Sequence, residues 1–468
     1  ELMIILGTNS IKDTGYDVAN SCRFDNNAYM QSGNTNSTNN PWTFSVWIKR
    51  AKVGAEQTLI MSYTDSNDFG LIRFGSDDTL LIGDYVNGSY VMKYETNRKF
   101  RDVSAWYHIV VSQSAVSGAS PATLLYVNGV QETSFGTSNA YSQNDTQNWQ
   151  KNGENFNFMM GQGEHYQQAY VCEAVWIDNT VYAASDFGEF DEDSGIWKPK
   201  DPSGLNFGTN GFYFDFADSG NLGDNEAGNS RADFSENNIA ATDQSTDTCT
   251  NNFCTMNPLD NFYSGATFSE GNIKVSSARY AGVTSTFALT KGKWYFEYKC
   301  VSRSGTSGFV GITSATATAT NYEFGNQSGE NVGYSVSLHN GSVYGNGGQV
   351  AASGTFESIN GGDFGMVALD FDNNKIYYGK DGTWGNSQNP ENGTNALSIV
   401  AVTQGASGHW RIYVGGETNN ATVFEMNFGS PPYAISSGNT DGDGYGNFEY
   451  AVPSGYFSLN TKNLAEYG

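Results

Sequence analysis

The sequence predicts an all-β protein made of two antiparallel β-sandwich domains joined by an irregular connector. Aromatic residues make up 14% of the 468 residues, and 55 residues are glycine. Short aromatic and β-branched runs are cut by clusters of Gly, Asn, Asp and Ser, which is typical of many short strands and turns. No long segment has the 3.6-residue apolar period of an amphipathic helix.

The first domain is predicted over residues 17–197. In Trp42–Arg50 the even positions 42–48 are apolar and the odd positions are polar except Trp47, which predicts a strand with one buried face. The pair Asn128-Gly129 between two valines is the strongest short-range signal for a β-hairpin. Further strands are predicted over residues 57–62, 69–74, 79–82, 89–94, 106–112, 123–127, 156–161 and 170–177.

Four of these motifs carry a resemblance. The segments 42–50, 106–111, 125–130 and 173–177, taken in this order and spacing, resemble a laminin-G/concanavalin A-like jelly roll. The resemblance implies two stacked antiparallel sheets over the whole of 17–197. Residues 1–16 are predicted to form a lead-in before this domain.

The connector is predicted over residues 198–262, which are rich in Gly, Asn, Asp and Ser. Its phenylalanines supply apolar anchors, so we expect an extended segment laid on a surface and not a disordered one. Within it, residues 211–217 alternate between aromatic and other residues, and this pattern indicates an edge strand added to a neighbouring sheet.

The second domain is predicted over residues 263–433, followed by a C-terminal extension, 434–468. Residues 367–372 and 375–380 are predicted to form a hairpin around residues 372–374, and Asp381-Gly382 predicts a second tight turn. The segments 293–299, 308–312, 362–372 and 374–384 resemble, in order, the strands of the SPRY domain. Phe364, Met366 and one extra residue before Trp384 depart from its usual pattern. The resemblance implies a compact β-sandwich used for recognition, with ligands held by loops at one end, and it implies no catalysis.

Taken together, the jelly roll, the intervening segments 186–197 and 208–216, and the SPRY-like domain resemble virion proteins of tailed bacteriophages. That resemblance implies a tail-fibre or capsid-attached protein at the virion surface, which is not an enzyme and adheres to a host-surface glycan or protein. The implied partners are other virion proteins and further copies of the chain, with a trimer favoured. Two alternatives stay open: a purely structural or decoration protein that mediates subunit contacts, and a glycoside hydrolase.

Composition argues against several other classes of protein. The net charge of −25 disfavours nucleic acid and anionic membrane surfaces, because both need a basic footprint. No run approaches the roughly 20 apolar residues of a membrane-spanning helix, so no membrane insertion is expected. Five cysteines in 468 residues are too few for a disulfide scaffold, and Cys249 and Cys254 have no further Cys or His nearby to complete a zinc site.

Ligand-binding candidates are aromatic residues beside amide or carboxylate groups in predicted loops, since such groups suit a sugar ring. In the first domain these are Tyr85 with Asn87, Tyr141 with Asn144 and Trp149, and His165 with Tyr166. In the second domain they are Tyr322, His339, Tyr344, Asn346 and Trp384.

Catalytic and metal candidates are few. A glycoside hydrolase needs two carboxylates flanking the scissile bond. The acidic run 189–193 is the one dense cluster of acids, but its setting predicts a solvated turn, and Glu173 is expected to be structural. No cofactor is predicted; a Ca²⁺ ion at Asp441 and Asp443 is the weak alternative, because oxygen-rich, glycine-bent loops suit that ion.

Overall fold

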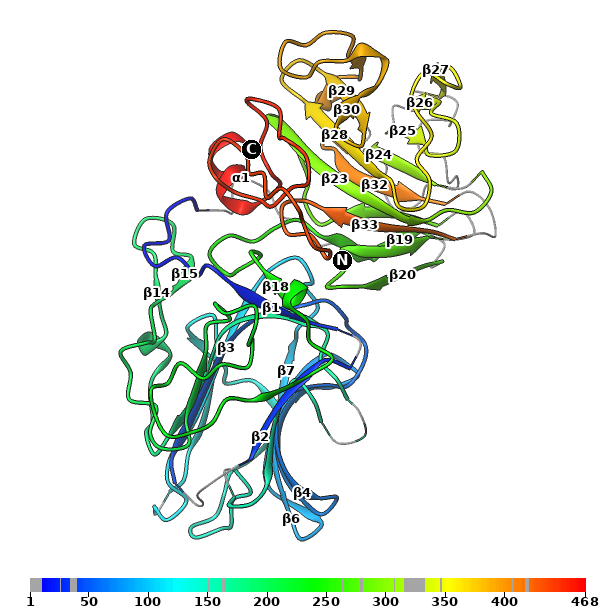
Figure 1. The fold of residues 1–468 in the computed structure, drawn as a ribbon. Coiled ribbons are helices and arrows are strands. Elements are labelled where there is room, and N and C mark those ends of the chain that lie inside the picture. The colour runs from blue at the N-terminus through cyan, green and yellow to red at the C-terminus, as the bar shows by residue number, and fades with distance from the viewer. Residues whose placement is uncertain are drawn as a thin grey trace. The chain divides into compact units, whose positions relative to one another are not determined.

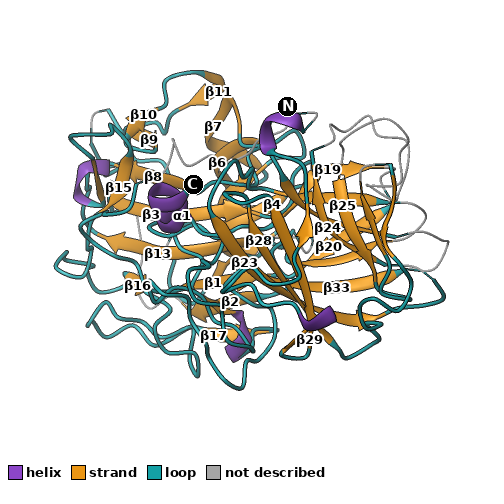
Figure 2. Ribbon diagram, turned by 90° about the horizontal axis from the view of Figure 1, so that it is seen from above, coloured by secondary structure: helices purple, strands orange, loops and turns teal. Residues whose placement is uncertain are grey.

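The structure is a computed structural model that describes residues 11–468 apart from 26, 34–39, 119, 150, 162, 164, 263–264, 278–280, 307, 315–332, 346, 406 and 417–420. Strands dominate the described residues and the helices are short (Figure 2). The predicted all-β class is confirmed. The chain divides into two compact units, residues 14–250 and residues 251–468 together with 11–13.

The first unit contains two eight-stranded antiparallel sheets (Figure 1). One sheet follows the order β10-β9-β8-β3-β13-β1-β18, with β16 also paired to β13, and is called here the covered sheet. Its strands are β1 (Ser21–Phe24), β3 (Trp42–Arg50), β8 (Tyr107–Gln113), β9 (Thr123–Val127), β10 (Val130–Gln131), β13 (Ala169–Asp178), β16 (Phe212–Phe214) and β18 (Gln244–Ser245).

The other sheet of this unit follows the order β11-β7-β6-β5-β4-β12-β2-β17 and is called here the open sheet. Its strands are β2 (Tyr29–Gly33), β4 (Gln57–Asp65), β5 (Asp68–Phe74), β6 (Thr79–Val86), β7 (Ser89–Lys99), β11 (Phe135–Asn139), β12 (Asn155–Phe158) and β17 (Ser235–Asn237). A separate hairpin pairs β14 (Gly188–Phe190) with β15 (Trp197–Pro199), and two 3₁₀ turns are η2 (Ala184–Asp186) and η3 (Ala241–Asp243).

The alternate apolar residues of β3 face the first core, as predicted. Trp42, Phe44, Val46 and Ile48 all lie in the core between the two sheets. The indole of Trp42 stacks on that of Trp176 with ring centroids 4.7 Å apart. The predicted hairpin is also present, since Val127 pairs with Val130 around Asn128 and Gly129, both of which have positive φ.

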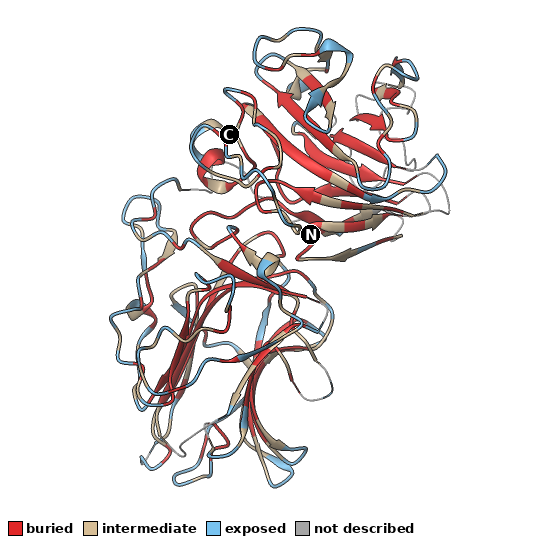
Figure 3. Cartoon of the chain, in the orientation of Figure 1, coloured by how far each residue is buried: buried red, intermediate tan, exposed pale blue. Residues whose placement is uncertain are grey.

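The covered sheet is buried on both faces. Figure 3 shows strands of the first unit largely in the colour of buried residues. All ten residues of β13 are buried. Those that face away from the core contact side chains from the rest of the unit, among them Phe187, Phe207 and Tyr213. The segment after residue 180 therefore wraps the outer face of this sheet.

This wrapping corrects the predicted boundary at residue 197. The expected edge strand at 211–217 is present as β16, but Phe212 and Phe214 point into the first core, where Phe234 joins them. A buried ion pair between Lys49 and Asp247 ties the end of the segment to β3. The predicted connector is thus part of the first unit up to residue 250, because its aromatic residues complete the burial of β13.

The second unit has a seven-stranded sheet in the order β19-β22-β32-β24-β25-β26-β27 and an eight-stranded sheet in the order β20-β21-β33-β23-β28-β29-β30, with β31 paired to β29. The seven strands are β19 (Met256–Phe262), β22 (Gly282–Ser285), β24 (Phe309–Thr313), β25 (Gly333–Ser337), β26 (Val343–Gly345), β27 (Gly348–Ala351) and β32 (Arg411–Gly415). The eight are β20 (Ala266–Ser269), β21 (Lys274–Ser277), β23 (Lys293–Ser302), β28 (Phe364–Asp370), β29 (Lys375–Lys380), β30 (Thr383–Trp384), β31 (Leu397–Ser398) and β33 (Thr422–Asn427).

Short helical elements complete the second unit: η4 (Gly385–Ser387), η5 (Val402–Gln404) and α1 (Thr461–Tyr467). The predicted hairpin of residues 367–380 is confirmed as β28 and β29. The second predicted turn joins β29 to β30 through Asp381 and Gly382, which both have positive φ.

The C-terminal segment also belongs to the second unit. Phe448 and Tyr456 pack on the outward side chains of β23, β28 and β29, including Tyr295. The buried carboxylate of Glu297 accepts hydrogen bonds from the backbone N–H groups of Glu449 and Tyr450 at 3.0 and 2.9 Å. Residues 448–456 thus cover the outer face of this sheet, while Leu459 and Leu464 join the main core, so the predicted extension is part of the second unit.

A substitution tests whether the predicted connector is part of the first core. The Phe214→Ala change removes a ring that packs 4.9 Å from Phe234 and 5.5 Å from Phe158. We expect a loss of about 3–5 kcal/mol in the unfolding free energy of the first unit, measured by urea denaturation. The control Phe190→Ala removes a ring that is 49% exposed. If both changes lower the unfolding free energy by the same small amount, the predicted connector lies on the surface and is not part of the first core.

Candidate functional site

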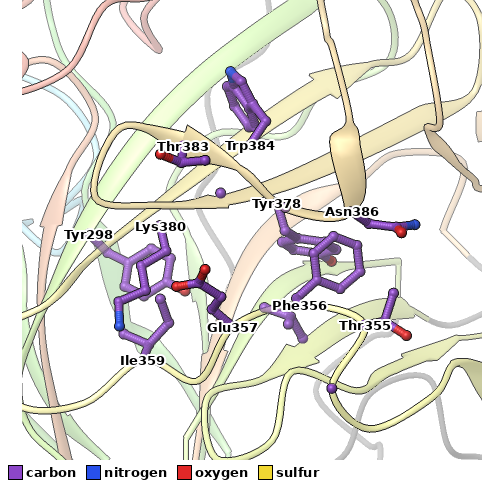
Figure 4. Close-up of a pocket in the computed structure, with 14 residues that line it drawn as sticks. Tyr298, Thr355, Phe356, Glu357, Ile359, Tyr378, Lys380, Thr383, Trp384 and Asn386 are labelled. Carbon is purple, nitrogen blue, oxygen red and sulfur yellow. The ribbon is translucent and has the colours of Figure 1, made fainter.

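A pocket in the second unit is the strongest candidate for a binding site (Figure 4). Its volume is about 240 Å³. Ligand pockets for drug-sized molecules span roughly 300–1,000 Å³. This pocket therefore has room for one sugar ring or one side chain of a larger ligand. Its lining comes from β23, β25, β29, β30, η4 and residues 354–359: Tyr298, Val336, Gly354, Thr355, Phe356, Glu357, Ile359, Tyr378, Gly379, Lys380, Thr383, Trp384, Gly385 and Asn386.

Two aromatic rings form one wall of the pocket. Phe356 and Tyr378 meet edge to face with centroids 5.6 Å apart. Phe356 lies so close to Gly385 that a Cβ there would be 2.6 Å from its ring, so this position needs glycine. The Tyr378 hydroxyl is buried and has no hydrogen-bond partner among the described residues. The ring of Tyr378 is part of the hydrophobic core of this unit, so its hydroxyl faces the interior and the wall of the pocket is apolar.

Charged groups stand beside this wall. The Lys380 Nζ lies 2.8 Å from Asp363 Oδ2 and donates to the carbonyl of Ser358 at 3.1 Å. The Asp363 carboxylate raises the pKa of Lys380 through this hydrogen bond. Glu357 is exposed at the rim. The pocket thus combines an apolar wall with an ammonium and a carboxylate, a pattern suited to recognition of a polar ligand.

The structure gathers only part of the predicted second-domain site. Trp384 lies at the pocket, but its indole points away from it in Figure 4 and packs on Tyr295 and Tyr377, with centroids 6.3 and 6.5 Å away. His339 and Tyr344 do not line the pocket: His339 is exposed near Arg303, and Tyr344 lies in β26 beside Phe309.

Two predicted residues, Tyr322 and Asn346, lie outside the described residues. The prediction missed Phe356 and Tyr378. Tyr378 is one of two adjacent tyrosines in β29, and the alternation of that strand does not indicate which of the two reaches a pocket.

In the first unit, Tyr85 and Asn87 lie at the end of β6 and in the following turn. Asn87 is exposed with φ of 49°, while Tyr85 is half-buried and stacks on Phe69 at 5.0 Å. Tyr141 and Trp149 lie in loops, as predicted, but their side chains are buried in the core and are not presented to a ligand. The Tyr141 hydroxyl donates to the buried Asp84 carboxylate at 2.6 Å, which explains why this polar ring faces inward.

The acidic run is engaged by cations. Glu189 lies in the β14–β15 hairpin, 3.3 Å from the Lys200 ammonium, and Asp191 lies 3.3 Å from Lys198. Hydrogen bonds from the backbone and side chain of Ser194 lower the pKa of Asp191 to about 2. The lowered pKa of Asp191 favours its charged form, whereas a general acid needs the protonated form.

Glu173 occupies an unusual place in β13. It has φ of 48° at a bulge where the register shifts between Cys172 and Val175. Its carboxyl accepts hydrogen bonds from the hydroxyls of Tyr213 and Tyr16 at 2.9 and 3.3 Å. Burial raises the pKa of Glu173 to about 8. The group therefore fastens two covering segments to the sheet, in line with the expected structural role.

A buried Ser–His pair lies on the same face. The Ser45 hydroxyl is 2.8 Å from His108 Nε2, and the Trp197 indole N–H donates to His108 Nδ1 at 2.9 Å. Because Nδ1 accepts, the ring proton sits on Nε2 and points at the serine oxygen. Burial lowers the pKa of His108 to about 3. In this arrangement the histidine cannot take the serine proton, as a catalytic pair requires.

The surroundings of Asp441 argue against the predicted Ca²⁺ ion there. Its carboxylate accepts five hydrogen bonds, from the backbone N–H groups of Asp443, Tyr445 and Ser458 and from the side chains of Ser458 and Asn463. These donors occupy the oxygens that a cation would need. In the described part of the chain, no group of three or more His, Cys, Asp or Glu side chains is placed to hold a metal ion.

Comparison with known proteins agrees with the fold of the first unit. Residues 24–174, about a third of the chain, match the family model of the concanavalin A-like lectin/glucanases superfamily. The first unit thus contains a concanavalin A-like domain. No curated protein matches the chain. None of the described helices is long and apolar enough to cross a membrane.

Several solved structures are similar in fold. The SPRY domain of human HERC1 is 13% identical, with a TM-score of 0.27, covering 36% of this chain and 96% of that one. A heptameric pentraxin of Limulus polyphemus is 15% identical, with a TM-score of 0.27, covering 36% of this chain and 80% of that one. A further human SPRY domain is 13% identical, with a TM-score of 0.25, covering 37% of this chain and 98% of that one. At these scores the likenesses carry no conclusion about function.

The raised pKa of Glu173 gives a prediction about pH. Its folded pKa of about 8 lies above the ordinary 4.5, so its contribution to stability is complete below pH 4.5 and is lost as pH rises towards 8. We expect the thermal unfolding midpoint of the first unit to fall between pH 5 and 8, and to fall less in Glu173→Gln. Some slope remains in the variant, because burial also raises the pKa of Asp84 to about 7.

The matched control is Glu189→Gln, which changes an exposed carboxylate and should leave the slope unchanged. Parallel midpoint curves for the native chain and Glu173→Gln would contradict the assignment of a protonated Glu173 at neutral pH.

Proposed function

We propose that this chain is a non-enzymatic adhesion protein on the surface of a tailed-bacteriophage virion, and that it binds a host-surface glycan or protein. The observation that carries the proposal is the pocket of the second unit, which sets an aromatic wall beside the Lys380 ammonium and the exposed Glu357 carboxylate. Its volume suits one unit of a larger ligand, so a single contact is weak. Several copies held together on a virion would gain avidity without any new contact.

The order of a concanavalin A-like domain followed by a SPRY-like one, which resembles phage virion proteins, supports the virion location. A trimer or other homo-oligomer, in contact with further virion proteins, would supply the multiple copies. The acidic surface implied by a net charge of −25 keeps such an array soluble.

The test is binding of the purified full-length chain to a glycan array and to candidate host cells, with and without EDTA. We expect saturable binding that EDTA does not change. Glu357→Ala removes the exposed carboxylate at the rim of the pocket and should weaken binding by about fivefold, which is the loss of one hydrogen bond of about 1 kcal/mol. Gln349→Ala, an exposed change in β27, is the control and should bind like the native chain.

Two outcomes favour the alternatives. A folded, oligomeric sample that binds neither glycans nor cells points to a structural or decoration role. Release of reducing sugar from a bound glycan, abolished by Glu189→Gln or Glu173→Gln, points to a glycoside hydrolase.

A further inference from the structure

Two cysteines meet on the outer face of the covered sheet in the first unit. Cys172 lies in β13, and its side chain faces away from the core, because the preceding Val171 belongs to the core between the two sheets. Cys172 instead joins a small outer cluster that includes Trp47 and Tyr170. Cys249 packs against the same cluster, and it lies at the end of the covering segment, residues 180–250.

The backbone around Cys249 is held in place on both sides. Before it, Asp247 forms the buried ion pair with Lys49 of β3. After it, the Thr250 hydroxyl accepts a hydrogen bond from the backbone N–H of Val18 at 3.1 Å. Cys249 is therefore held against the sheet by contacts that do not involve its own side chain.

The thiols of Cys172 and Cys249 are hydrogen-bond partners of each other, and both cysteines are free in this structure. A disulfide has an S–S bond of about 2.0 Å, and its two Cβ atoms lie about 3.5–4.5 Å apart. Thiols that already bond to each other need only a small movement of their side chains to reach that geometry.

The remaining cysteines lie elsewhere. Cys22 faces the core on the opposite side of the covered sheet. Cys254 and Cys300 belong to the core of the second unit. The pair on the outer face of β13 is therefore distinct from all three.

We propose that Cys172 and Cys249 are a disulfide site, and that their oxidation fastens the covering segment covalently to β13. The oxidant is a small-molecule disulfide such as oxidised glutathione. The thiolate of Cys249, which is the partly exposed member of the pair, attacks the glutathione S–S bond, forms a mixed disulfide and releases one reduced glutathione. The thiolate of Cys172 then attacks the Cys249 sulfur and releases the second. In total the two thiols lose two protons and two electrons, which convert one oxidised glutathione into two reduced ones.

The surroundings of the pair suit a lasting cross-link better than a rapid redox switch. Burial raises the pKa of both thiols, so little of either is in the thiolate form that reacts, and exchange is slow at neutral pH. Disulfides form and persist outside a reducing cytoplasm. A bond between residues 172 and 249 closes a long loop, and closure of a long loop restricts the unfolded chain most.

The test compares the full-length chain after prolonged exposure to oxidised glutathione and after reduction with dithiothreitol. Each sample is unfolded in guanidinium chloride with N-ethylmaleimide, then digested and analysed by mass spectrometry. We expect all five cysteines to be alkylated in the reduced chain. In the oxidised chain we expect two peptides joined through Cys172 and Cys249, with Cys22, Cys254 and Cys300 alkylated.

Thermal unfolding of the same two samples tests what the cross-link does. Oxidation should raise the unfolding midpoint of the first unit by on the order of 10 °C. Cys249→Ser removes one partner and should abolish this rise. The matched control Cys22→Ala changes a buried cysteine on the core side of the same sheet and should keep it.

Five alkylated cysteines in the oxidised chain would overturn the proposal. A cross-link between any other pair would do the same, as would a glutathione adduct at Cys249 that never proceeds to a bond with Cys172. Equal midpoints for the reduced and the cross-linked chain would contradict the fastening of the covering segment.

Discussion

The organisation of both units depends on one constraint: a central strand that is buried on both faces must be covered twice. In the first unit β13 has no exposed residue, so the sheet across the core covers one face and residues 180–250 cover the other. In the second unit the outward side chains of β23, β28 and β29 are covered by residues 448–456 in the same way. Long turn-rich segments are therefore structural parts of each sandwich, held by buried contacts such as Lys49 with Asp247 and Glu297 with the backbone at 449–450.

The same constraint determines where ligands can approach. A sheet face that the chain has wrapped is closed, so binding surfaces are left at the rims and on faces without a cover. The pocket beside Tyr378 opens at a rim formed by β29, β30 and residues 354–359. It has room for about one sugar unit or side chain. Weak contacts of this size suit a protein displayed in many copies, because avidity multiplies them.

Strands and tight hairpins could be predicted from the sequence, because both depend on local rules. The alternation in Trp42–Arg50 gave the bounds of β3, and Asp381-Gly382 marked the turn between β29 and β30. The covering segments could not be predicted, since their aromatic residues are spaced singly among turn residues without a period. Phe234 and Phe448 acquire partners only in the folded chain. The pocket could not be predicted for the same reason, since Phe356, Glu357 and Tyr378 come together only in the tertiary structure.

The most direct test of the central claim, that this chain binds a host-surface ligand through preformed sites, is a crystal structure of the full-length chain. The crystals would be soaked with the oligosaccharide that binds most tightly on the array. The account predicts new density for a sugar ring in the pocket, within hydrogen-bonding distance of the Glu357 carboxylate, with the surrounding side chains in place as in the free chain. Density confined to other surfaces, or a pocket filled by a neighbouring copy of the chain in every crystal form, would contradict it and favour the structural role.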